Sequence, residues 1–348
     1  MLPNTELICY FLDVGQGASQ IITLGKQKAI VIDAGPPPTK KDKRNIPVQL
    51  LNDLQIDYIE ALILSHNDWD HAGNTINILT QYKGNIGKIF LLQDRSTNDL
   101  KDIFVLLKEY VDEKYIHTND IQRLEKQSGQ KKVIFQETRE SGTEILLEAL
   151  YPLSIMDSLI AERRGKPNIT CSVVRLQVGN SNIVFSGDAL IEAWKRIYTE
   201  NRGVSLESNI ATLPHHGGII DTLLGTESFD FFNRIIDAKT LIVSVGPNSY
   251  GHPLPNAIHA ATRAGKEILC TQMTRQCCSV YDRLCSSSQK FYPPILSQSQ
   301  QDGLIACAGT VAVNVSPDAI EIQHLEKYRR WKSQHSGRMC IPFDPSYQ

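Results

Sequence analysis

Residues 65–74 constrain this chain more than any other part of its sequence. They read Ser-His-Asn-Asp-Trp-Asp-His-Ala-Gly-Asn and directly follow the apolar run 61–64, which predicts a short buried strand. Four potential metal ligands thus occur within six residues: His66, Asp68, Asp70 and His71. Imidazole and carboxylate groups together suit a divalent cation such as zinc or manganese. A polar turn whose acids cap the next helix is the alternative, but this concentration of ligands favours a metal site.

The composition is that of a soluble globular protein. The chain has 348 residues, 41% of them hydrophobic and 21% charged, and its formal net charge is −2. A chain with this charge balance has no overall positive potential of the kind typical of nucleic-acid binding. This balance does not exclude a local basic groove. No apolar run approaches the ~20 residues of a membrane span, and the N-terminus lacks the features of a signal peptide. We therefore expect a cytoplasmic protein that does not enter a membrane.

The eight cysteines are unevenly distributed. Cys9 and Cys171 lie in apolar, strand-like runs and are expected to be small core residues, whereas the other six fall in the last quarter of the chain. In a reducing compartment a disulfide framework is not expected. A structural zinc held by Cys270, Cys277 or Cys278, and Cys307 is an alternative, but the finger-like CxxC spacing is missing.

Strands and helices alternate along the chain without an obvious linker. The predicted strands are 7–12, 18–24, 29–32, 61–64, 86–92, 133–136, 144–151, 171–178, 183–185, 210–213, 240–245, 267–271, 310–315 and 319–323. The predicted helices are 46–54, 75–81, 99–110, 119–127, 190–198, 229–236 and 255–264. Residues 286–302, rich in Ser, Gln and Pro, are typical of a mobile insertion. This pattern predicts an α/β protein with helices outside two packed mixed β-sheets.

Chemically capable side chains recur where other predicted strands end. They are Asp33, Asp188, the pair His215 and His216, and His252. Strand ends on one edge of an α/β protein converge. These residues are therefore expected to lie close to residues 65–74, which we call the metal-ligand segment. Each has a simpler alternative when taken alone, since Asp188 could cap a helix and the histidine pair could form a plain turn.

Six motifs in a fixed order carry a resemblance to a known family. They are 11–17 (FLDVGQG), 31–35 (VIDAG), 65–71 (SHNDWDH), 185–188 (FSGD), 213–217 (LPHHG) and 250–253 (YGHP). Over about residues 6–270 the chain resembles the metallo-β-lactamase superfamily, and most of all its ComEC-like metallo-hydrolase branch. The resemblance implies a four-layer αββα sandwich with a site for one or two metal ions. It also implies hydrolase activity, which for the ComEC domain is proposed to be that of a nuclease. We therefore expect a hydrolase domain over 1–285. For residues 286–348 the sequence pattern predicts the insertion, a last hairpin that completes the fold and a basic tail.

The resemblance also implies roles for individual residues. His66 and Asp68 would hold one ion, and a second ion would be held by Asp70, His71 and His215, with Asp188 bridging the two. Asp33 would orient a metal-bound histidine. His216 or His252 would donate a proton to the leaving group or bind a phosphate.

The chain departs from most of the superfamily at two places. Asp68 stands where a histidine is usual, and the histidine that usually precedes the Gly-Asp motif is not evident. Asn168 and Ser172 lie where the ComEC-like branch has an Asn and a Ser instead. An oxygen-rich site shifts the expected metal from zinc toward manganese, with magnesium as an alternative. The cysteine-rich end lies outside the resemblance.

These observations favour metal-dependent hydrolysis of a phosphodiester in DNA, RNA or a small nucleotide. Local basic segments at 40–44, 163–166 and 327–332 support a nucleic-acid or nucleotide substrate. The alternative is a hydrolase of a small molecule such as a thioester, lactone or β-lactam. A non-catalytic binding module is a third hypothesis, disfavoured by the nearly complete ligand set. The sequence does not decide whether the chain also binds a protein partner.

Overall fold

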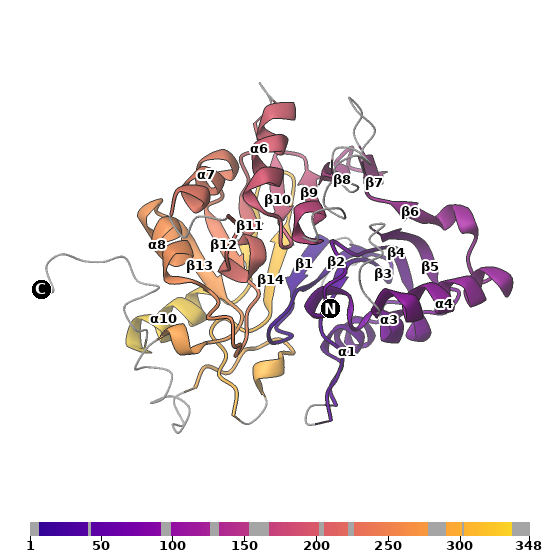
Figure 1. The fold of residues 1–348 in the computed structure, drawn as a ribbon, viewed down its shortest axis with the longest axis horizontal. Helices are drawn as coiled ribbons and strands as arrows, with labels where there is room; N and C mark the ends of the chain where they lie inside the picture. Colours follow the sequence, from indigo (N-terminus) through magenta and orange to yellow (C-terminus); the bar gives the residue numbers. More distant parts are fainter. Residues whose placement is uncertain are drawn as a thin grey trace, which may run out of the picture.

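The computed structural model describes residues 7–40, 43–91, 99–125, 132–152, 167–201, 205–221, 226–277, 290–300 and 303–335. Two β-sheets form its centre (Figure 1). The first runs, in spatial order, β15 (Ile320–Ile322), β14 (Val311–Val315), β1 (Leu7–Phe11), β2 (Ser19–Gly25), β3 (Lys28–Ala34), β4 (Tyr58–Ile63), β5 (Ile86–Leu91) and β6 (Ile121–Arg123). The second runs β13 (Glu267–Cys270), β12 (Thr240–Val243), β11 (Ile210–Thr212), β10 (Ser181–Phe185), β9 (Val173–Val178), β8 (Glu144–Tyr151) and β7 (Lys132–Thr138).

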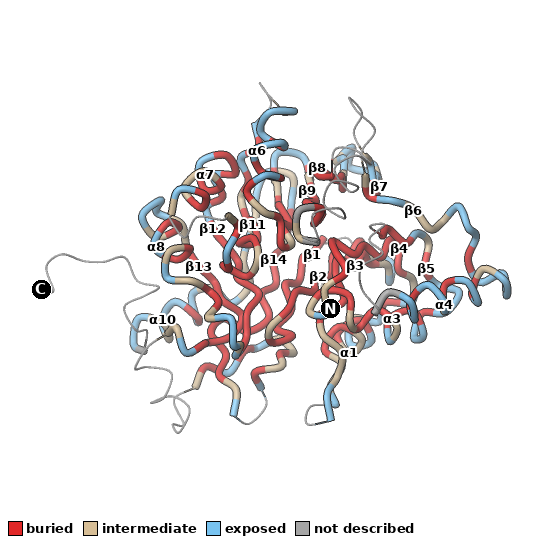
Figure 2. The backbone as a smooth tube through the Cα atoms, in the orientation of Figure 1, coloured by how far each residue is buried: buried red, intermediate tan, exposed pale blue. Residues whose placement is uncertain are grey.

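Helices cover the outer face of each sheet. On the first sheet lie α1 (Ile46–Asp53), α3 (Thr75–Gln81) and α4 (Asp99–Asp112), which share one buried apolar cluster with it. On the second lie α6 (Ile191–Glu200), α7 (Glu227–Ile236) and α8 (Pro255–Arg263). The central strands between them are almost wholly buried, whereas the edge strands β6, β7 and β15 are partly exposed (Figure 2). The predicted αββα sandwich with two mixed sheets is therefore confirmed.

Strand β1 shows how the sequence builds these layers. All five of its residues are buried, because alternate side chains enter different cores. Ile8 and Tyr10 join the cluster beneath the first helices, whereas Cys9 and Phe11 point between the sheets. The Phe11 ring stacks on Phe185 of the second sheet, with ring centroids 5.7 Å apart. This contact joins the two sheets close to the end of β10.

Parallel pairing brings the functional strand ends to one edge. Strands β3, β4 and β5 run parallel in the first sheet, and β10, β11, β12 and β13 run parallel in the second. The carboxyl ends of parallel strands lie on the same side of a sheet, where loops commonly carry function. Asp33, the metal-ligand segment, Asp188 and the histidine pair therefore converge there.

One predicted helix was wrong. In place of a helix over 119–127, the structure has a single 3₁₀ turn, Thr118–Asp120, followed by the edge strand β6. Residues 126–131 lie outside the described ranges. Strand β6 pairs in parallel with β5, and Ile89 lies opposite Ile121. The open backbone groups of the β5 edge find partners in this way, so pairing outweighs local helix propensity.

The segment predicted to be a mobile insertion, 286–302, also differs where it is described. Residues 290–300 pack against the fold, and Ser299 donates from its amide to the buried carboxylate of Asp13 over 3.1 Å, with its hydroxyl bonded to the same oxygen. Gln272 donates to the other Asp13 oxygen over 2.5 Å. A buried carboxylate needs such donors, which ties the segment to the loop after β1. Residues 286–289 and 301–302 lie outside the described ranges.

The chain after this segment returns to the first sheet. The predicted last hairpin is present as β14 and β15, and β14 pairs antiparallel with β1. Helix α10 (Leu325–His335) follows it. No helix in the described ranges combines the length and the apolar character that crossing a bilayer requires.

Candidate metal centre

The metal-ligand segment leaves the first sheet at the end of β4 and turns at once into the short helix α2 (Trp69–Ala72), with Asp68 as its N-cap. A backbone contact fixes its position, because the Ala18 amide donates to the Asp70 carbonyl over 3.0 Å. Glycine is needed beside this contact. A Cβ on Gly17, whose φ is +145°, would lie 2.4 Å from the same oxygen.

The turn after β11 holds two consecutive histidines in the left-handed region. The φ angle is 54° at His215 and 53° at His216, a conformation that costs on the order of 1 kcal/mol for each non-glycine residue. The Nδ1 atom of His215 is bonded to the Ile219 carbonyl at 2.7 Å, and that of His216 to the Ser244 carbonyl at 2.6 Å. These bonds turn both Nε2 atoms toward Asp188.

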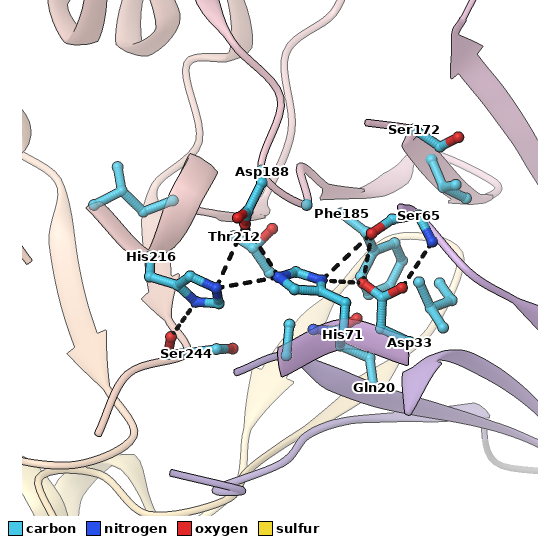
Figure 3. Close-up of a pocket in the computed structure, with 15 residues that line it drawn as sticks. Gln20, Asp33, Ser65, His71, Ser172, Phe185, Asp188, Thr212, His216 and Ser244 are labelled. Atoms are coloured by element: carbon cyan, nitrogen blue, oxygen red, sulfur yellow. Dashed lines mark hydrogen bonds and ion pairs between the residues drawn. The ribbon is translucent and has the colours of Figure 1, made fainter. Parts of the chain in front are cut away.

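The carboxylate of Asp188 lies at the centre of the site and faces two pairs of histidines. Its Oδ2 is 3.6 Å from the Nε2 atoms of both His66 and His215. Its Oδ1 is 3.1 Å from Nε2 of His71 and 3.4 Å from Nε2 of His216 (Figure 3). One buried carboxylate therefore connects two adjacent sets of potential ligands.

Each set contains a further aspartate. Asp68 Oδ2 lies 3.5 Å from His66 Nε2, and Asp70 Oδ2 lies 3.3 Å from His216 Nε2. Among the described residues, two groups of three have ligand atoms within 4.8 Å of one another: His66, His71 and Asp188, and Asp70, His71 and His216. The geometry thus offers two neighbouring cation positions.

A second layer of hydrogen bonds orients the histidines. Asp33 Oδ2 accepts from His71 Nδ1 and from the Ser65 hydroxyl, both at 2.7 Å (Figure 3). Because that hydroxyl proton is used for Asp33, its oxygen is free to accept the Nδ1–H of His66 at 3.1 Å. One carboxylate therefore directs the Nε2 atoms of two histidines toward Asp188.

The buried polar atoms of the site that lack a hydrogen-bond partner fit a divalent cation. His66 Nε2 and Asp188 Oδ1 are buried and make no hydrogen bond. The Nε2 atoms of His71 and His216 lie 3.1 Å apart although each ring has an acceptor at its own Nδ1. Two nitrogen lone pairs facing each other need a proton or a cation between them. The donor set is the mixture of imidazole and carboxylate that zinc and manganese accept.

The charges of the site show the same requirement. Burial and the neighbouring His66 would lower the pKa of His71, but the carboxylates of Asp188 and Asp33 raise it to about 10. Burial would raise the pKa of Asp188, but His71, His216 and His66 hold it well below its usual range. The metal-free protein therefore keeps His71 fully protonated at neutral pH, opposite the ionised carboxylate of Asp188.

Cation binding is accordingly expected to release at least one proton, since His71 must lose its proton to become a ligand. The affinity for Mn²⁺ or Zn²⁺ should fall as the pH falls, because protons compete for the same nitrogens. Calorimetric titrations of chelator-treated protein, in two buffers of different ionisation enthalpy, measure the protons released. Equal binding heats in both buffers would contradict this expectation.

Most of the predicted site residues meet here, but their grouping differs from the prediction. His216 lies next to Asp70 and His71, the place predicted for His215. His215 lies instead on the His66 side of Asp188, and the Asn168 side-chain nitrogen is 3.4 Å from its Nε2. Sequence alone cannot decide between adjacent histidines, because the choice depends on the left-handed turn that they form.

His252 lies beside the centre rather than within it. Its ring centroid is 5.4 Å from that of His215 and 6.5 Å from that of His216. Burial and these two histidines lower the pKa of His252 to about 4. The imidazole is therefore neutral at pH 7, which favours a hydrogen-bonding role over the proposed proton donor.

Two contributors were missed by the sequence reasoning. Ser65 was taken only as the start of the motif, although its hydroxyl connects Asp33 to His66. Cys171 is buried as predicted, but its sulfur also accepts from the Asp188 amide at 2.9 Å and lies 3.6 Å from His66 Nδ1. A hydroxyl directly before a ligand was a usable signal for Ser65, whereas the direction of the Cys171 side chain was not readable from sequence.

The suggested structural zinc finds no support in the part of the chain that the structure describes. The groups of converging ligands there contain no cysteine, although Cys270 and Cys307 are buried and Cys277 is partly buried. Cys278 and Cys285 lie outside the described residues, as does the basic segment 163–166.

Comparison with known proteins agrees with the geometry. Residues 12–131 match the sequence profile of the metallo-beta-lactamase superfamily. The match covers about a third of the chain, so it shows similarity to that superfamily over this segment. The match includes the ligand segment, and the two mixed sheets with outer helices are the metallo-beta-lactamase fold. No curated protein is similar to the chain in sequence.

Solved structures with some likeness of fold are distant from this chain in sequence. A mutant CmlA beta-hydroxylase is 11% identical, with 76% of this chain and 52% of that chain covered and a TM-score of 0.42. The short form of human tRNase Z is 10% identical, with coverage of 70% and 93% and a TM-score of 0.41. Zn²⁺-bound PqqB from Methylobacterium extorquens is 11% identical, with coverage of 73% and 85% and a TM-score of 0.35. The chain thus spans about half the length of the first of these.

Proposed function

We propose that the chain is a metal-dependent phosphodiesterase of the ComEC-like type that acts on nucleic acid or a nucleotide. The observation that carries the proposal is the position of Asp188, whose two oxygens face two separate histidine pairs. A carboxylate shared in this way suits two neighbouring cations, the arrangement typical of phosphoryl-transfer sites. Bound cations would acidify an attacking water and offset the charge that develops on the leaving oxygen.

Different side chains would hold the two cations, orient the ligands and contact the substrate. His66, Asp68 and His215 would hold one cation with Asp188 Oδ2, while Asp70, His71 and His216 would hold the other with Oδ1. Asp33 and Ser65 keep the ligand nitrogens aimed inward. His252 would donate a hydrogen bond to a phosphate oxygen beside the centre.

The oxygen content of the site supports a hard cation. Asp68, Asp70 and Asp188 contribute three carboxylates, and Asp68 replaces the histidine usual in the superfamily. Carboxylates favour manganese or magnesium more than an all-imidazole set would, so we propose Mn²⁺ as the activating ion, with Zn²⁺ as the competitor. The oxygen-rich set also disfavours the alternative of a thioester, lactone or β-lactam substrate.

Metal content and cleavage, measured on one preparation, test the proposal. Elemental analysis quantifies bound metal, and single- and double-stranded DNA, RNA, bis(p-nitrophenyl) phosphate and a chromogenic β-lactam are assayed with Mn²⁺, Mg²⁺ or Zn²⁺. We expect metal-dependent phosphodiester cleavage that is lost in Asp70→Ala and kept in Asp53→Ala, which changes an exposed aspartate at the end of α1. Bound metal together with cleavage of the β-lactam alone would overturn it.

A further inference from the structure

The described side chains of the candidate metal centre differ in their exposure to solvent. His66, His71, His216 and Asp188 are buried, whereas Asp68, Asp70 and His215 keep about a quarter to a third of their side chains exposed. Among the described residues, a substrate would reach the centre over these last three, which we call the opening.

Three exposed apolar residues lie near site residues in the sequence. The described chain has nine large hydrophobic side chains that are exposed, and three of them lie within four residues of Asp68, His215 or His252. Trp69 lies between Asp68 and Asp70, Ile219 follows the histidine pair, and Tyr250 lies two residues before His252. A singly exposed apolar side chain needs no explanation by itself, so what matters is how Tyr250 and Trp69 are held beside the candidate metal centre.

Tyr250 is the most exposed of the nine, at 71%, yet its position is fixed. Asn248 accepts at Oδ1 from the amides of both Tyr250 and His252, at 3.0 Å each. The Asn248 side-chain nitrogen in turn donates to the carbonyls of Gly246 and His252, at 2.8 and 3.0 Å. The loop is thus organised before any ligand arrives, which limits the entropy that binding would cost.

The rings of this loop form a series that leads from solvent to the centre. The Tyr250 ring lies 5.6 Å from His252 with an interplanar angle of 32°, and the His252 ring lies 6.5 Å from His216 at 22°. The His252 and His216 rings are stacked, and the Tyr250 ring is tilted against His252. Because 71% of Tyr250 is exposed, most of this residue stays available to a ligand.

Trp69 presents a second, supported ring. It begins α2, and its indole packs so closely over Gly73 that a Cβ there would lie 3.0 Å from Trp69 Cδ2. Pro37 lies 2.8 Å from the same Cβ position, so the base of the indole is enclosed while 54% of the residue stays exposed. The charges beside it, Asp68 and Asp70, would repel a phosphate unless cations were bound.

From these observations we infer that Tyr250 and Trp69 bind an unpaired nucleobase next to the phosphate that is held at the metal centre, an inference that rests on the proposed function. Every nucleobase offers a flat π-face, and stacking on an aromatic ring tolerates any sequence. Bases within a duplex are already stacked on one another and expose only their edges. The substrate class is therefore single-stranded nucleic acid, or a nucleotide diester, rather than duplex.

The test compares oligonucleotides of one length that carry bases with oligonucleotides in which every residue is abasic. For single-stranded, base-bearing substrate, Tyr250→Ala and Trp69→Ala should each raise KM roughly tenfold, while Tyr250→Phe, which keeps the ring, should match wild type. Abasic substrate should bind wild type as weakly as base-bearing substrate binds the alanine variants. Tyr115→Ala, which removes an exposed ring after α4, is the matched control.

A binding measurement keeps the inference separate from catalysis. Fluorescence anisotropy of labelled, cleavage-resistant phosphorothioate oligonucleotides on the metal-loaded protein should show the same ranking of variants without cleavage. Cleavage of base-bearing and abasic strands with equal KM, or equal KM for single strand and duplex, would overturn base stacking and leave the phosphodiesterase standing. Base-dependent binding without cleavage of any phosphodiester would overturn the proposed function and leave the stacking site standing.

Discussion

Asp188→Asn is expected to abolish tight binding of metal at the candidate centre and, with it, hydrolysis. The amide is nearly the size of the carboxylate, but it lacks the negative charge that faces four histidines. Loss of a residue that merely orients a ligand costs 10- to 100-fold in metal affinity, so loss of the shared carboxylate should cost at least about 100-fold. Equilibrium dialysis followed by elemental analysis measures this directly.

The control must separate metal loss from unfolding. Asp53→Asn makes the same chemical change at an exposed position of α1 and should leave metal content unchanged. Thermal unfolding of both variants after chelation reports whether the fold persists without Asp188. A folded Asp188→Asn protein that still holds two ions with wild-type affinity would show that Asp188 does not bridge them.

The candidate site was largely predictable because its ligands are concentrated at strand ends. His66, Asp68, Asp70 and His71 are neighbours in sequence, so a single loop after β4 had to keep them close. The convergence of parallel strand ends then brought Asp188 to the same edge, although more than a hundred residues separate it from that loop. Both inferences depend only on short-range sequence and on a general property of α/β sheets.

The details that were wrong or missing depend on tertiary contacts. Whether His215 or His216 lies beside Asp70 is decided by two left-handed residues in succession, for which the sequence carries no glycine signal. Strand β6 exists because the edge of β5 was open, and residues 290–300 are packed because Asp13 is buried and needs donors. In each case a distant partner outweighed the local pattern.

Trp194→Ala is expected to cause a large loss of folding stability. Trp194 on α6 is fully buried, and its ring meets Phe232 of α7 edge to face at 4.8 Å. Removing a buried aromatic side chain of this kind costs about 3–5 kcal/mol of unfolding free energy, because a cavity is left where the ring was. Urea unfolding followed by circular dichroism measures the change. Tyr198→Ala, one turn later and half exposed, should cost less than about 1 kcal/mol.

Trp194 also connects this packing to the metal centre. Its indole nitrogen donates to the carbonyl of Ala189 over 3.3 Å, directly after Asp188. Trp194→Phe keeps most of the apolar volume but removes this hydrogen bond, so its stability loss should be smaller than that of the alanine variant. If the bond helps to position Asp188, the phenylalanine variant should still lose metal affinity relative to Tyr198→Ala. Unchanged metal affinity in Trp194→Phe would show that Trp194 contributes to packing alone. Asp188 would then be positioned by the hydrogen bond from its backbone amide to the Cys171 sulfur.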